Sequence, residues 1–172
     1  AASDVYKRQE YASKRKSIYK GKVFRKPLIQ ADLWDGDPDI DAIARLTYQP
    51  CVKFEIQNPF CSEQITPFNS QNTFLSREVL PYYSVLPHIQ RMDDIWGAYI
   101  LQHFFPNSVV FNKASVYPDR NEQDVITNLE AEILGYRQTL NLINDLKNWQ
   151  KFLPDEAVKY FNTYMKTMKA LN

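Results

Sequence analysis

The chain has 172 residues, of which 44% are hydrophobic and 14% aromatic, and its formal net charge is +1. This predicts one globular domain, or a large part of one, with enough apolar residues for a core. The near-zero charge argues against a general nucleic-acid binder, and no run of about 18 apolar residues predicts a membrane span. Cys51 and Cys61 are too few for a disulfide framework or a cysteine zinc site, although a single bridge stays open.

The first residues differ in composition from the rest of the chain. Residues 1–9 resemble a peptide produced when sequencing-adapter DNA is translated, so we expect them to be non-native and the natural protein to continue upstream. Residues 1–26 hold nine Lys or Arg against two acids. This pattern favours a solvated helix near residues 9–19 followed by a loop, and the alternative is an arm that binds phosphate or nucleic acid.

An aspartate-rich turn follows a predicted buried strand at residues 27–34. Gly36 and Pro38 break the strand, and Asp39 is expected to cap a helix over residues 40–46. A strand end followed by a helix start is where α/β folds place ligands. Five aspartates lie within ten residues: Asp32, Asp35, Asp37, Asp39 and Asp41. Capping and solvation account for two or three of them, and the others are suited to Mg or Mn, although the spacing is not that of an EF-hand.

The middle of the chain is predicted to contain little regular structure. Residues 51–56 alternate and predict a strand, whereas residues 77–80 predict one helical turn that ends at Pro81. Between them, residues 67–75 are rich in amides and then become apolar. Amides donate and accept hydrogen bonds, which suits sugar hydroxyls and buried loops equally well.

Two adjacent carboxylates, Asp93 and Asp94, precede a run of apolar residues at helical spacing. This predicts a helix that starts at the pair and ends at residues 104–105, before Pro106. One aspartate is expected to be the N-cap. Capping does not need the second, so the alternatives are a purely structural pair or one cap beside a general base or polar anchor.

The C-terminal third is predicted to be mainly helical. A short strand at residues 109–111 and a loop at residues 115–120 precede a long amphipathic helix over residues 122–149, and a last helix runs from about residue 154 to 170. Gly135 is expected to allow a bend or close packing. The long helix is expected to bury one stripe: Val125, Leu129, Ile133, Tyr136, Leu140, Ile143 and Leu146.

The sequence lacks the residues that several common kinds of functional site require. Four glycines form no phosphate-binding loop, and two histidines form no metal-binding pattern. The remaining chemistry-bearing residues are carboxylates, amides and aromatics. Aromatic rings stack on sugars and carboxylates bind or deprotonate hydroxyls, so this set is typical of a carbohydrate-binding site.

Three ordered motifs resemble the STELLO-like glycosyltransferase family: residues 30–42 (QADLWDGDPDIDA), 67–73 (PFNSQNT) and 92–96 (MDDIW). Residues 91–98 (RMDDIWGA) also resemble the helix start of the UDP-arabinopyranose mutases, or reversibly glycosylated polypeptides. These families are similar to GT-A glycosyltransferases, whose mixed α/β sheet binds a nucleotide sugar and a divalent metal. The resemblance implies an α/β chain that is the C-terminal portion of such a domain, with an acceptor-side part at residues 10–120 and a helical appendage at residues 121–172.

The resemblance also implies roles for individual residues. Asp94, or else Asp93, would be the acceptor-side acid or base in sugar transfer. Asp35 and Asp37 match the Asp-x-Asp form of a site for Mn or Mg, or with Asp39 and Asp41 they form an acidic wall opposite Asp94. The remaining substrate-binding candidates are Asn69, Gln71, Asn72, Arg91 and Trp96, where Trp96 would line the pocket or anchor its helix.

The resemblance further implies binding partners and a cellular location. The donor would be a nucleotide sugar and the acceptor a carbohydrate or polypeptide, in the cytosol or the Golgi lumen. The nucleotide-binding half would lie upstream, so the chain is expected to be inactive alone. The alternative is a non-catalytic partner of a glycosylation complex, which would dock through the helices of residues 122–170.

Overall fold

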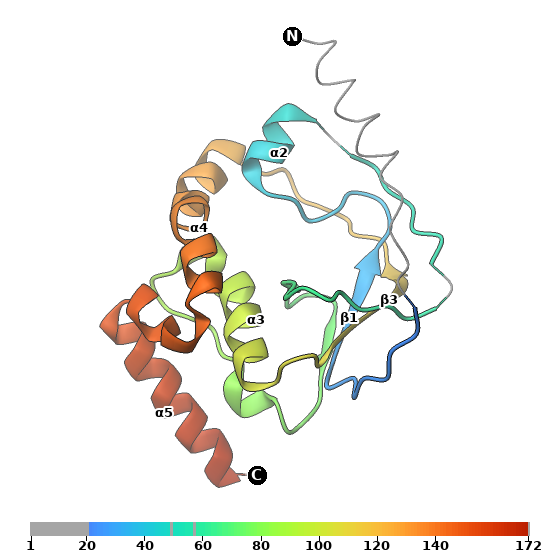
Figure 1. Cartoon of the computed structure of the whole chain (residues 1–172). Coiled ribbons are helices and arrows are strands. Elements are labelled where there is room, and N and C mark those ends of the chain that lie inside the picture. The colour runs from blue at the N-terminus through green and yellow to red at the C-terminus, as the bar shows by residue number, and fades with distance from the viewer. Residues whose placement is uncertain (1–20, 49, 57, 172) are drawn as a thin grey trace.

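The computed structural model describes residues 21–48, 50–56 and 58–171. The expected leader, the helix predicted near residues 9–19 and most of the basic segment lie outside these residues. The described chain is an α/β fold in which a small mixed sheet and a group of helices lie on opposite sides of one central helix (Figure 1). No described helix is long and apolar enough to cross a bilayer.

The sheet has three strands in the order β2-β1-β3. The central strand β1 (Ile29–Trp34) pairs antiparallel with β2 (Thr73–Leu75) and parallel with β3 (Val109–Val116). Ile29 and Ala31 are buried on one face of β1, as the period-two alternation of a strand requires. Because β1 and β3 are parallel, the loops that follow them leave the sheet at the same edge.

Helix α3 (Asp93–Phe104) is the central element of the fold (Figure 1). Its residues are apolar around most of its circumference, and seven of its twelve residues are buried. Ala98 and Leu101 pack with the sheet, whereas Trp96 and Ile100 pack with the helices on the other side. A helix that is apolar on all sides is one buried between two layers.

The helical layer consists of α4 (Val125–Asn144), the 3-10 segment η3 (Leu146–Phe152) and α5 (Asp155–Leu171). Leu142, Trp149 and Phe161 share a hydrophobic cluster with Trp96 and Ile100 of α3. The last helix was predicted correctly. The predicted continuous helix over residues 122–149 was wrong, because α4 ends at Asn144 and Asp145 has a non-helical backbone.

The predicted buried stripe of the long helix was wrong for three of its seven residues. Ile133, Tyr136 and Leu140 are 41%, 45% and 70% exposed. The face that packs inward instead carries Glu132, Gly135, Thr139 and Leu142, whose spacing follows one side of a helix. Gly135 permits close packing without a bend, because a Cβ atom there would overlap the Met92 side chain.

Three other local predictions need correction. Residues 51–56 form no strand; only Val52 makes a bridge, to Gly36. Pro81 does not end a helical turn but lies inside the 3-10 helix η1 (Leu80–Tyr82), at an early position where its missing N–H costs nothing. The short strand predicted at residues 109–111 extends to Val116 as β3.

The helix caps also differ from the prediction. Helix α2 (Ala42–Thr47) is capped by Asp41, whose Oδ1 accepts from the Ala44 N–H at 3.0 Å, and not by Asp39. Neither Asp93 nor Asp94 is the N-cap of α3. The 3-10 helix η2 (Gln90–Met92) leads directly into α3, so Met92 takes the cap position and both aspartates lie in the first turn.

Candidate functional site

Asp94 connects the start of α3 to the loop of residues 69–72. Its Oδ1 accepts a hydrogen bond from the Ile95 N–H at 2.8 Å, and its Oδ2 accepts from the Ser70 N–H at 3.3 Å. Burial raises the pKa of the Asp94 carboxyl, and the charges of Asp93 and Asp39 raise it further against the effect of these hydrogen bonds. Among the described residues, no basic side chain forms an ion pair with it. Asp94 is therefore a half-buried carboxyl group suited to holding or accepting a proton.

Tyr83 lies beside this carboxyl group. Its hydroxyl oxygen is buried and has no hydrogen-bond partner of normal geometry among the described residues. Burial raises the pKa of the Tyr83 phenol, and the charges of Asp94 and Asp93 raise it further, while the nearby Ser70 side chain lowers it. Tyr83 therefore keeps its proton and remains a hydrogen-bond donor next to Asp94. The sequence analysis did not select it, because it occurs in an aromatic connection without a charged neighbour.

The aspartate loop, residues 35–41, follows β1 and is held largely by arginines. Arg45 donates to both carboxylate oxygens of Asp37, at 3.1 and 3.0 Å. Arg120, which follows β3, donates from Nε to the Asp37 backbone oxygen at 3.1 Å and lies 3.3 Å from an Asp39 carboxylate oxygen. Both arginine side chains are mostly buried. These ion pairs fix the loop against the end of β3.

The aspartate loop does not fit the proposed metal site in this geometry. Asp37 is bound by two arginines, and Asp35 Oδ1 accepts from the Phe54 N–H at 2.8 Å. Within the described residues, no group of three or more His, Cys, Asp or Glu side chains is arranged to hold a metal ion. Binding of Mn or Mg by Asp35 and Asp37 remains a prediction, and no chemical step is assigned to a metal here.

The three candidate amides have different environments. Asn72 joins the two parallel strands, because its Nδ2 donates to the Leu33 carbonyl at 3.2 Å and to Ser115 Oγ at 3.0 Å. Asn69 stabilises its own turn by accepting from the Asn72 N–H at 3.4 Å. Gln71 is exposed. Gln71 is thus the most exposed of the three, whereas Asn69 and Asn72 shape the loop that contacts Asp94.

The other two candidates, Arg91 and Trp96, form hydrogen bonds with side chains of α4 and not with the loop of residues 69–72. Arg91 Nε donates to Glu132 Oε1 at 3.0 Å, and Glu132 is buried. Trp96 is fully buried, and its Nε1 donates to Thr139 Oγ1 at 2.9 Å. Of the two roles considered for Trp96, the contacts match the anchoring of its helix.

Glu132 was missed by the sequence analysis although it organises one corner of the molecule. Its Oε2 accepts from the Ala42 N–H at 2.7 Å. The Tyr136 hydroxyl lies 2.8 Å from Glu132 Oε2 and 2.9 Å from Asp41 Oδ1, so its single proton is shared between the two carboxylates. Burial and the two carboxylate partners raise the pKa of Tyr136. The available signal was its position: Glu132 shares a helix face with Gly135, three residues later, and with Thr139.

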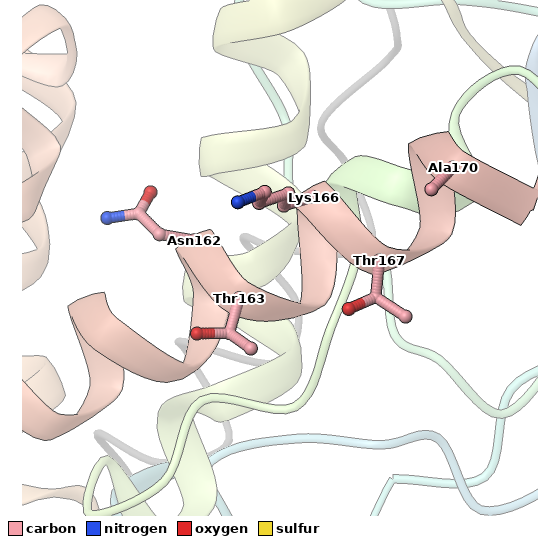
Figure 2. A pocket seen from close by; sticks show the side chains of 5 residues that line it. All are labelled: Asn162, Thr163, Lys166, Thr167 and Ala170. Carbon is pink, nitrogen blue, oxygen red and sulfur yellow. The ribbon is translucent and has the colours of Figure 1, made fainter.

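The predicted acidic groups thus come together only in part. Asp94 contacts the loop of residues 69–72 through the Ser70 N–H, and the charge of Asp39 adds a small increase to its pKa. Asp35 and Asp37 have their own partners. A separate surface hollow is lined by Asn162, Thr163, Lys166, Thr167 and Ala170, all from α5 (Figure 2). It holds none of the predicted site residues.

Comparison with known proteins finds no matching family model and no matching curated protein. The described chain is an α/β fold with a three-stranded mixed sheet. The resemblance to STELLO-like glycosyltransferases and to the GT-A fold rests on the three sequence motifs alone.

Proposed function

We propose that the chain is the acceptor-side part of a GT-A-like glycosyltransferase domain and that Asp94 is the base that receives the acceptor's hydroxyl proton. The observation that carries the proposal is the environment of Asp94. Its pKa is raised by burial, no basic residue neutralises it among the described residues, and it lies between the start of α3 and the loop of residues 69–72. A carboxylate with a raised pKa is a better proton acceptor than one in water.

Asp93 has a supporting role in this proposal. Its Oδ1 accepts from the Asp94 N–H at 2.8 Å, and its negative charge raises the pKa of Asp94. Tyr83 is the hydrogen-bond donor in this proposal, because its buried hydroxyl retains a proton that it can donate to an oxygen of the acceptor sugar. A neighbouring acceptor and donor are what binding a sugar hydroxyl requires.

The proposal is tested by acceptor binding, since the nucleotide-binding half is placed upstream by the resemblance. Methyl glycosides of glucose, galactose and arabinose are titrated into the protein, and binding is measured by saturation-transfer NMR. Asp94→Asn should weaken binding about tenfold, because a hydrogen bond to a charged group contributes about 1.5–3 kcal/mol.

Asp155→Asn is the matched control, because Asp155 also lies in the first turn of a helix, α5, and has no place in the proposed site. It should alter the dissociation constant by less than about twofold. Equal effects of the two substitutions, or no binding of any of the three glycosides by the wild-type protein, would contradict the proposal.

The second candidate function is a non-catalytic partner of a glycosylation complex. It is favoured by the outer face of α4, where Ile126, Ile133 and Leu140 are 57%, 41% and 70% exposed. Exposed apolar side chains at helical spacing are common at protein interfaces. If this face mediates assembly, Leu140→Glu should abolish co-sedimentation with a glycosyltransferase domain that the wild-type protein retains, and Asp94→Asn should not.

A further inference from the structure

Two buried hydrogen-bond donors lack partners at the edge of the sheet where β1 and β3 end. They are Trp34 Nε1 and Arg120 Nη2, and neither has a partner among the described residues. The Arg120 guanidinium carbon lies 5.4 Å from the centre of the Trp34 ring, so the two donors belong to one stacked pair. A buried donor without an acceptor is costly, so an acceptor that reached these two groups would relieve that cost.

An exposed aromatic ring lies at the same edge. The Tyr117 side chain follows β3 and covers Gly36, where an added Cβ atom would lie 2.6 Å from the ring. Gly36 also has a φ of +91°, which favours glycine, so this close approach is built into the backbone. Tyr117 is 73% exposed, and the outer face of its ring is available for stacking.

The charge around these groups selects the kind of ligand. Five aspartates lie between residues 32 and 41, and the arginines bound to them in the structure are Arg45 and Arg120. The negative excess disfavours a phosphate or carboxylate ligand. A neutral polyhydroxylated molecule, by contrast, accepts from the unpaired donors, donates to the aspartates and stacks on the aromatic ring.

We propose that Trp34, Tyr117 and Arg120 form a subsite for a neutral pyranose ring. It rests on the proposed function for the role of that sugar, which would be part of the acceptor bound near Asp94. Asp39, in the loop that follows β1, pairs with Arg120 of this subsite. The binding itself follows from the three side chains.

The experiment observes the indole N–H of Trp34 directly by two-dimensional ¹H–¹⁵N NMR. The chain has three tryptophans, and Trp34→Phe assigns the signal. Titration with methyl glucopyranoside should shift the Trp34 indole signal and leave that of Trp96 in place, since Trp96 already donates to Thr139. Methyl glucuronide should bind several-fold more weakly, because of its negative charge.

Variants at Tyr117 give the matched comparison. Tyr117→Ala should weaken binding about five- to tenfold, whereas Tyr117→Phe, which keeps the ring, should retain it. Tyr160→Ala on α5 removes another half-exposed tyrosine and should have no effect. An unmoved Trp34 signal at saturating glycoside, tighter binding of the glucuronide, or unchanged binding by Tyr117→Ala would each overturn the subsite.

The same titrations separate this inference from the proposed function. Binding that depends on Tyr117 but not on Asp94 would support the subsite and reject Asp94 as the acceptor-side residue. Binding that depends on Asp94 but not on Tyr117 would reject the subsite and leave the proposed function standing.

Discussion

Asp37 and Asp94 are both carboxylates at the ends of secondary structure, but their surroundings differ. Asp37 is held by Arg45 in a two-point ion pair and lies near Arg120. Asp94 accepts only backbone hydrogen bonds, and its burial raises its pKa. The comparison separates two uses of the same side chain: an aspartate bound by arginines fixes a loop, whereas a desolvated aspartate without a cation is available for proton chemistry.

The largest expected effect comes from removing an arginine that holds the aspartate loop. Arg120→Ala should lower the free energy of unfolding by about 2–3 kcal/mol, because Asp37 and Asp39 lose charged hydrogen-bond partners. Urea denaturation measures the change. Lys113→Ala, at an exposed position on β3, is the control and should stay within about 0.5 kcal/mol. A small effect of Arg120→Ala would show that these ion pairs do not stabilise the loop.

Arg91→Ala should have a smaller effect on the free energy of unfolding, about 1–2 kcal/mol. The buried Glu132 loses its charged partner but keeps the Ala42 N–H and the Tyr136 hydroxyl. Thermal denaturation with Arg137→Ala as the exposed control on α4 measures the difference. If the two variants are equally stable, Arg91 contributes nothing to holding Glu132.

Asp94→Asn should change how the stability depends on pH more than it changes the stability at any one pH. A carboxyl group whose pKa is raised in the folded state binds more protons there than in the unfolded state, so the contribution of Asp94 to stability falls as the pH rises above about 4. The Asn variant lacks this loss. Its stability relative to wild type should therefore increase from pH 3 to pH 7, as measured by urea denaturation; a difference independent of pH would contradict the raised pKa.

The smallest expected effect is that of Asp93→Asn. Asp93 lies in the first turn of α3, where a negative charge interacts favourably with the helix dipole. Its loss should cost about 0.3–1 kcal/mol, measured by denaturation at low ionic strength. The cost should shrink in 1 M salt, because exposed charges are screened there. A larger loss that is unaffected by salt would assign Asp93 a buried role like that of Asp94.

The sequence predicted elements whose signals are local. The strand at β1, the start and end of α3, and α5 each follow from a continuous apolar pattern with a boundary residue such as Pro106 or Pro154. The strand predicted over residues 51–56 failed because alternation alone supplies no pairing partner, and only Val52 found one.

The buried face of α4 was not predictable from its own residues. Glu132 and Thr139 are polar, so the sequence pattern does not place them on a buried face. Each nevertheless accepts a hydrogen bond from a side chain distant in sequence: Glu132 from Arg91, and Thr139 from the Trp96 indole. The candidate site shows the same limit. Asp94 was selected from its position beside Asp93, but the burial that raises its pKa and the hydroxyl of Tyr83 beside it depend on how α3 meets the loop of residues 69–72.

The contact between Gly135 and Met92 has an evolutionary consequence. Met92 immediately precedes the two aspartates, and its side chain fills the space that a side chain at position 135 would need. The two positions therefore share one fixed volume. In homologous chains, a residue larger than glycine at position 135 should occur together with a smaller side chain at position 92, so that the pair varies jointly while the distance from α4 to the start of α3 is kept.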